Sequence, residues 1–162
     1  MGYDSPAGEL HMRPNQMLFR AALVVPAALL CWTAGTTAQT RTFVARLSIV
    51  PITVAMQETV AGVGSATAVL AGDRLTVEGT FQGLRSPATI ARLHIGPRAI
   101  RGAAFADIPV PSVTSGSFKG VVQLSGAQRE ALEKRSLYIQ LYSAKAPDGN
   151  LWGWFFPQEE KR

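Results

Sequence analysis

The chain has 162 residues, of which 47% are hydrophobic and 17% charged, and its formal net charge is +5 at pH 7. This composition excludes a disordered chain, and this length accommodates one domain of ordinary size. The basic residues are scattered and form no run with interleaved aromatic side chains, so we expect no nucleic-acid interface.

The first 38 residues have the order of a secretory signal peptide. The basic residue Arg20 precedes an apolar run at 21–32, and small residues follow as far as Ala38. The run is shorter than the ~20 residues that a bilayer-spanning helix needs, so we expect no permanent membrane span in the mature chain. The pattern predicts cleavage after Ala38 and export to the periplasm or the medium, with Met17 as an alternative start.

The rest of the chain divides into a domain at 39–158 and a short charged tail at 159–162. The one cysteine of the sequence, Cys31, lies inside the leader, so the domain has no thiol for a disulfide, a metal ion or a nucleophile. Its stability must come from packing, which a chain of about 120 residues can supply.

Apolar and polar residues alternate with a period of two along most of 39–158, which predicts β-strands. The residues Ala71-Gly72-Asp73-Arg74 have the character of a hairpin turn between two such segments. The expected strands cover 43–50, 65–70, 75–81, 88–95, 103–108, 116–124, 136–142 and 150–156. Their spacing is typical of a sandwich or barrel of antiparallel strands.

One segment has the pattern of a helix. Ser125 and Gln128 have the spacing of a capping box, in which each side chain bonds the other residue's free backbone amide. This predicts a short amphipathic crossover helix near 125–134. Its expected core-facing residues are Ala127, Ala131 and Leu132.

Several motifs follow one another in a familiar order. They are FVARL at 43–47, GSATAVLAGD at 64–73, LTVEGTFQGL at 75–84, SPAT at 86–89, HIG at 94–96, GVVQLSGAQ at 120–128, LYIQL at 137–141 and PDGNLWG at 147–153. In this order the chain resembles the CHRD (chordin) domain family over about 43–156. The resemblance implies an all-β fold, an antiparallel, immunoglobulin-like Greek-key β-sandwich, and it implies little about activity.

The chain departs from the family pattern at its polar positions. The family usually has a His-x-His pair where this chain has Arg92 and His94, and another histidine where it has Tyr142. The Glu, Arg and Gln of the family's closing Gly-Glu-Ile-Arg-Gly-Gln pattern are replaced here by Asn150, Trp152 and Trp154. Any polar cluster of the family is thus largely rewritten in this chain.

His94 is the one histidine of the expected domain. Strand alternation places Ala91 and Leu93 toward the core, so His94 should point away from it, beside Arg92. One histidine without cysteine cannot supply the three or four donors of a transition-metal site, so we expect neither a metal nor a cofactor. The chain also lacks a Gly-x-Ser-x-Gly elbow, and the charge of Arg92 would weaken His94 as a base, so we expect no catalytic residues.

The aromatic segment at 151–156 has two interpretations. Trp152, Trp154 and Phe156 would share one face of a strand, and a strand buried on both sides, or an aromatic face covered by a loop, would hide them. The alternative is an exposed platform for sugar rings, a peptide or a partner protein. Packed aromatic faces are the more common, which favours the first interpretation.

The loop at 96–102 carries Arg98 and Arg101 between two glycines. Both arginines could simply be solvated, or they could form an anion-attracting corner with Arg92 and His94. The candidate binding residues are therefore Arg92, His94, Arg98, Arg101, Tyr142, Asn150, Trp152 and Trp154.

These observations together favour an exported, non-enzymatic module with a binding or protein-interaction role. Its partner would be a protein or glycan of the cell envelope and not a nucleic acid. The alternative is a metal- or small-molecule-binding protein that completes its site through a partner subunit.

Overall fold

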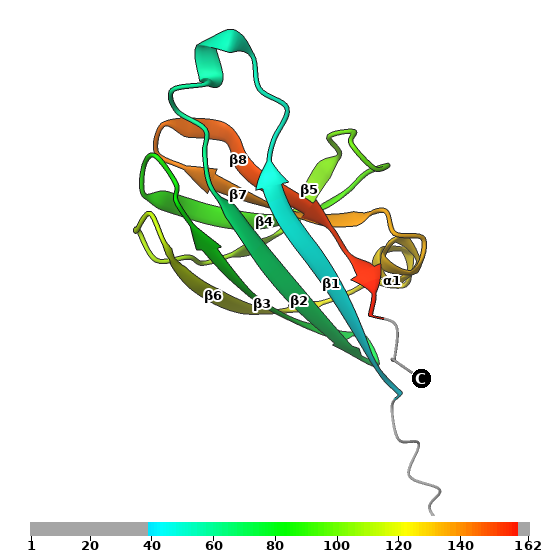
Figure 1. Ribbon diagram of the computed structural model, residues 1–162. Coiled ribbons are helices and arrows are strands. Elements are labelled where there is room, and N and C mark those ends of the chain that lie inside the picture. Colours follow the sequence, from blue (N-terminus) through cyan, green and yellow to red (C-terminus); the bar gives the residue numbers. More distant parts are fainter. Residues whose placement is uncertain (1–38, 159–162) are drawn as a thin grey trace, which may run out of the picture. The chain divides into compact units, whose positions relative to one another are not determined.

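The structure, a computed structural model, describes residues 39–158 (Figure 1). The predicted leader at 1–38 and tail at 159–162 lie outside the described residues. The strands are β1 (Thr40–Ile49), β2 (Val63–Ala71), β3 (Arg74–Gln82), β4 (Ala88–Ile95), β5 (Ala103–Ile108), β6 (Gly116–Gln123), β7 (Leu137–Ser143), β8 (Ala146–Trp154) and β9 (Phe156–Pro157). A 3₁₀ turn, η1 (Val54–Met56), follows β1, and the α-helix α1 (Gly126–Glu133) follows β6.

All strand pairs are antiparallel and belong to one path, in the order β5-β4-β7-β8-β1-β2-β3-β6, with β9 also paired to β1. The end of β1 joins the two halves of this path, because Ser48 and Ile49 pair with Trp152 and Leu151 of β8. At the other ends of the path, Ile108 of β5 packs on Gly120 of β6. The sheet is therefore nearly closed and barrel-like.

This topology confirms an all-β antiparallel fold with one short α-helix in the described residues. It does not confirm the immunoglobulin-like Greek-key sandwich, because hydrogen bonds of β1 run continuously from one half of the sheet to the other. A sandwich of that type would need two sheets without such a shared strand.

The main core lies inside the curved sheet. It is built from the residues of the strands that point inward, which alternate along each strand. The largest of these side chains are fully buried, including those of Phe43, Leu47, Leu93, Ile139 and Leu151. The predicted inward direction of Ala91 and Leu93 is confirmed. Burial of each large apolar side chain contributes about 1.5–3 kcal/mol, so this interior is the main source of stability.

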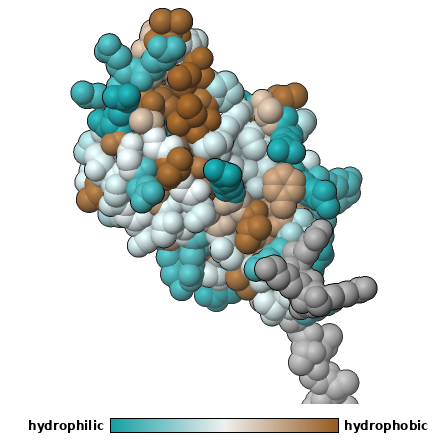
Figure 2. Space-filling model, in the orientation of Figure 1, coloured by the Kyte–Doolittle hydropathy of each residue, from teal (hydrophilic) through white to brown (hydrophobic). Residues whose placement is uncertain are grey.

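The strand β7 is buried on both faces, and all seven of its residues are shielded from solvent. Its outer face, with that of β8, carries a second apolar cluster in which Val50, Val60, Tyr138, Trp152 and Trp154 pack together. Part of the cover is the segment 50–62, which contains η1. Figure 2 shows apolar side chains gathered on this projecting segment, whose Val54 is 83% exposed.

The predicted capping box begins α1. The amide of Gln128 donates to the Ser125 hydroxyl (3.3 Å), and the amide of Ser125 donates to the Gln128 side-chain oxygen (2.8 Å). Ala131 and Leu132 are buried as predicted, whereas Ala127 is exposed and that prediction was wrong. The reason is that the helix packs on the sheet with its last turn and leaves its first turn in solvent.

The start of β8 also differs from the prediction. The sequence Pro147-Asp148-Gly149 suggests a turn, with a strand from 150 onward, yet β8 starts at Ala146. The turn lies at residues 144–145 instead, because Ser143 pairs directly with Ala146 across a tight hairpin.

The close approach of β8 to β1 depends on Gly153, where a β-carbon would lie 2.5 Å from the backbone oxygen of Arg46. We expect Gly153→Ala to lower the free energy of unfolding by about 1–3 kcal/mol, since one strand must move away from the other. Gly126→Ala is the matched control, because a β-carbon there has no neighbour within 4 Å and alanine favours the helix. Urea unfolding measures both, and equal stability of the two variants would contradict this account.

Candidate functional site

The three neighbouring strands β4, β7 and β8 bring a row of aromatic side chains to the face opposite the core. The register places His94, Tyr138 and Trp154 directly beside one another, one from each strand. Tyr142 and Trp152 lie on the same face. We call these five side chains (His94, Tyr138, Tyr142, Trp152 and Trp154) the aromatic row.

The members of the aromatic row stack on one another and are shielded from solvent. Tyr138 lies between His94 (ring centroids 4.8 Å apart) and Trp154 (4.5 Å), and Trp154 meets Trp152 edge-on at 4.7 Å. Each of the two tryptophans is only 7% exposed. The row is thus a packed face covered by loops, and it is not an open platform.

The polar atoms of the row fix the loop at 96–102. The indole N–H of Trp154 donates to the backbone oxygen of Gly96 (3.1 Å), and the amide of Gly102 donates to the Tyr138 hydroxyl (2.9 Å). Gly102 is required for this fit, because a β-carbon there would collide with the backbone oxygen of Ile95. Both ends of the loop are therefore held against the row.

His94 uses both of its ring nitrogens within the protein. Its Nδ1 lies 2.9 Å from the backbone oxygen of Gly102, and its Nε2 lies 3.0 Å from the Tyr142 hydroxyl. A carbonyl oxygen only accepts, so Nδ1 carries the proton and the Tyr142 hydroxyl donates to Nε2. A metal ion or a substrate could reach either nitrogen only after one of these bonds breaks.

Asn150 has an equivalent structural role for the segment 50–62, which covers the other part of this face. Its side-chain amide donates to the backbone oxygen of Ala61 (2.9 Å), and its side-chain oxygen accepts from the amide of Ala61 (3.3 Å). Asn150 is fully buried, so it secures the segment 50–62 and faces no solvent.

A hollow of about 480 Å³ opens beside the tryptophan end of the row. The outward residues Val44, Arg46 and Ser48 of β1 form one side of it. Trp152 and Trp154 of β8 line it together with Arg98 of the loop and Phe156 of β9. Figure 2 views the face formed by β1 and β9, where polar and apolar side chains lie next to one another.

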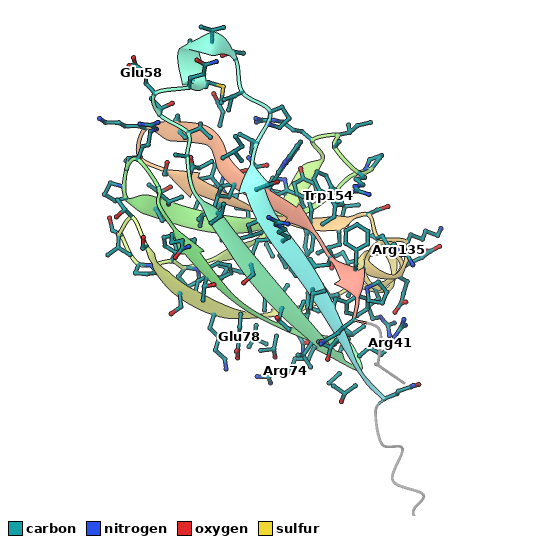
Figure 3. All side chains as sticks on the ribbon, viewed as in Figure 1. Arg41, Glu58, Arg74, Glu78, Arg135 and Trp154 are labelled. Carbon is teal, nitrogen blue, oxygen red and sulfur yellow. The ribbon has the colours of Figure 1, made fainter. Side chains whose placement is uncertain are left out.

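The charged groups of this hollow are all basic. Arg46 and Arg98 line it, and no aspartate or glutamate does. The Arg98 guanidinium lies 5.5 Å from the centroid of the Phe156 ring, and that of Arg135 lies 6.0 Å from the same ring. Figure 3 shows Trp154 and Arg135 on the same side of the protein, and Arg74 near the bottom of the view, at the start of β3.

The structure divides the predicted binding residues into two groups. Arg98, Trp152 and Trp154 meet at the hollow, whereas Arg92, His94 and Tyr142 contact one another at the other end of the aromatic row. In that second group, Arg92 is paired with Asp107 (3.0 Å). Arg101 donates to the backbone oxygen of Asp148, and the charges of Arg92, Arg101 and Asp107 all reach His94. The four residues of the expected anion-attracting corner therefore do not face a common space.

Sequence reasoning placed Phe156 on one face with the tryptophans, but it missed Val44, Arg46 and Ser48 as their neighbours. The alternation of β1 does show that these three residues point outward. What it cannot show is that β1 lies beside β8, because their pairing joins residues about 100 positions apart.

Within residues 39–158, no helix is long and apolar enough to cross a membrane. In the same range, no three side chains of His, Cys, Asp or Glu gather as ligands of a metal ion would.

Comparison with known proteins identifies the family. The model of the CHRD domain matches residues 43–154, which is most of the chain and includes β4, β7 and β8. The chain therefore belongs to the CHRD family, as its motifs suggest. Neither the curated proteins nor the solved structures gave a match.

Burial makes His94 a pH-dependent element of stability. Burial lowers the pKa of His94 below its ordinary value, the nearby guanidinium charges lower it further, and the bond to Gly102 opposes them. The unfolded chain, with a histidine pKa of about 6.5, then binds more protons than the folded one as the pH falls below that value. Stability is complete above about pH 6.5 and decreases as the pH falls toward the lowered pKa.

We expect the free energy of unfolding to fall by less than about 1.4 kcal/mol per pH unit between pH 6.5 and the lowered pKa of His94. The variant His94→Gln keeps polar atoms at this position but does not titrate, so its stability should change less over pH 7.5–5. Urea unfolding across this range measures the difference. The same pH dependence in both proteins would show that other groups cause it.

Proposed function

We propose that this protein is an exported, non-enzymatic CHRD module that binds a protein or glycan of the cell envelope or its surroundings. The observation that carries the proposal is the hollow beside Trp152 and Trp154, where aromatic and basic side chains meet solvent on a rigid sheet. Aromatic rings with a nearby arginine are typical of binding surfaces. The hollow also has a volume within the range of about 300–1,000 Å³ of small-ligand sites.

The non-enzymatic part of the proposal rests on His94. Its two ring nitrogens are held by Gly102 and Tyr142, and its imidazole is 6% exposed. A general base needs a free nitrogen within hydrogen-bond reach of a substrate proton. The same bonds disfavour the alternative of a metal site shared with a partner subunit, for which we find no supporting contact in the described residues.

Export is the second element of the proposal, and it is supported by the order of residues in the leader. We expect the protein made in a bacterium to accumulate outside the cytoplasm with Gln39 as its first residue. N-terminal sequencing of the fractionated product tests this. The variant Leu29→Arg, which interrupts the apolar run, should remain unprocessed in the cytoplasm. An uncut chain in the cytoplasm for both proteins would reject export.

Binding at the hollow predicts a saturable change in tryptophan fluorescence when the separated glycan or protein fraction of the cell envelope is added. Arg98→Ala should weaken this response at least tenfold, because Arg98 lines the hollow. Arg74→Ala is the matched control, since it removes an exposed arginine at the distant end of β3. No response to any fraction, or an equal loss in both variants, would reject the hollow as the binding surface.

A further inference from the structure

We propose that the hollow beside Trp152 and Trp154 binds a carboxylated sugar unit of an acidic polysaccharide. This inference rests on the proposed binding function and names the chemistry of the ligand. Three properties of the hollow lead to it: its unneutralised positive charge, the type of its cations, and its aromatic wall.

The positive charge of the hollow is not neutralised by the protein. The arginines in ion pairs within residues 39–158 are Arg41, with Glu133, and Arg92, with Asp107. Arg46 and Arg98 have no carboxylate partner among these pairs, and no acidic side chain lines the hollow. An anionic ligand would therefore gain attraction from both arginines without displacing an internal partner.

Both cations that line the hollow are arginines, and they come from different segments. Arg46 extends from β1, and Arg98 extends from the loop at 96–102, so the two approach the hollow from the strand and from the loop. A guanidinium group binds a carboxylate through two parallel hydrogen bonds, which a lysine cannot do. The Arg98 side chain is also held over the Phe156 ring, which limits its freedom before a ligand arrives.

The aromatic wall selects a ligand that offers more than a charge. Phe156 is half-buried, and the edges of Trp152 and Trp154 reach the hollow, so apolar ring surface lies next to the guanidinium groups. A free phosphate ion would leave this surface uncovered. A sugar ring with a carboxylate presents C–H groups to the aromatic wall, its hydroxyls to Ser48 and its charge to the arginines.

The backbone at the hollow disfavours an extended peptide as the ligand. A peptide that binds a sheet gains most of its affinity from the free backbone groups of an edge strand. Here β1 pairs with β2 from residue 40 to residue 47, and on its other side it pairs with β9 at 43–44 and with β8 at 48–49, so it is an interior strand. The hollow thus offers a ligand side chains and no free strand edge. A saccharide can bind through side chains alone.

The test is calorimetric titration of the purified protein with an α-1,4-linked galacturonic acid trimer and with the galactose trimer of the same linkage. We expect saturable binding of the acidic trimer, and binding at least tenfold weaker for the neutral one. Arg46→Ala and Arg98→Ala should each weaken binding of the acidic trimer at least tenfold, while Arg74→Ala leaves it unchanged. Arg98→Lys keeps the positive charge but cannot form two parallel hydrogen bonds to a carboxylate, so its affinity for the acidic trimer should lie between those of the unaltered protein and Arg98→Ala.

Two further probes separate the alternatives. Phe156→Leu keeps an apolar side chain but removes the ring, so it should weaken binding of the acidic trimer without changing the titration with inorganic phosphate. Equal affinity for both trimers, or binding unaffected by either arginine variant, would overturn the inference. Tighter binding of a glutamate-rich peptide than of the acidic trimer would overturn it in favour of a protein partner.

The failure of this inference can be told apart from failure of the proposed function. If an envelope fraction changes the fluorescence in an Arg98-dependent manner but the acidic trimer does not bind, the module binds there and its ligand is not a carboxylated sugar. If neither the fractions nor the trimer responds, both proposals are wrong. Circular dichroism of each variant, with an unfolding midpoint near that of the unaltered protein, confirms that the loss is local.

Discussion

The arrangement of this protein depends on how the outer face of β4, β7 and β8 is covered. β7 is buried on both sides, so the sheet packs on two faces instead of one. The side chains on the outer face are mostly aromatic rings that carry polar atoms. These atoms need hydrogen-bond partners once they are buried. A buried polar group without a partner costs about 1–3 kcal/mol, and here the partners are the backbone groups of Gly96 and Gly102. The demand for hydrogen bonds therefore fixes the loop at 96–102 on the sheet.

The hydrogen bonds that hold the loop at 96–102 occupy polar atoms of the aromatic row, so these atoms are not free to contact a ligand. Nδ1 of His94, the hydroxyl of Tyr138 and the indole N–H of Trp154 bond to the loop, and Nε2 of His94 bonds to Tyr142, so they are structural groups. The loop that they hold carries Arg98 to the hollow, next to Phe156. His94 thus helps to hold the loop that carries Arg98. Ala99, beside Arg98, has a positive φ of 65°, a conformation that is tolerated only where the surroundings hold the backbone.

The chain belongs to the CHRD family, and the covered outer face of β4, β7 and β8 lies within the residues that match the family. The family's polar motif positions fall at His94, Tyr142 and the end of β8, and the structure brings these positions to one face of one sheet. In this chain the face has been filled with aromatic side chains, and Trp152 and Trp154 occupy positions that carry an arginine and a glutamine in the family pattern. The result is a packed layer of aromatic side chains, and Arg46 and Arg98 line the hollow beside it.

The sequence by itself determined the features that depend on neighbours along the chain. Alternation identified the strands and the inward direction of Leu93, the spacing of Ser125 and Gln128 identified the capped helix, and the order of weak motifs identified the family. Only the tertiary structure decided that β1 lies against β8, that the aromatic row is covered, and that Arg46 and Arg98 share a hollow with Phe156. Apart from the bond between His94 and Gly102, these contacts join residues from 36 to about 110 positions apart, and local periodicity contains no information about which strands become neighbours. The same limit explains why the continuous sheet was not foreseen: alternation is identical in a sandwich and in a nearly closed sheet.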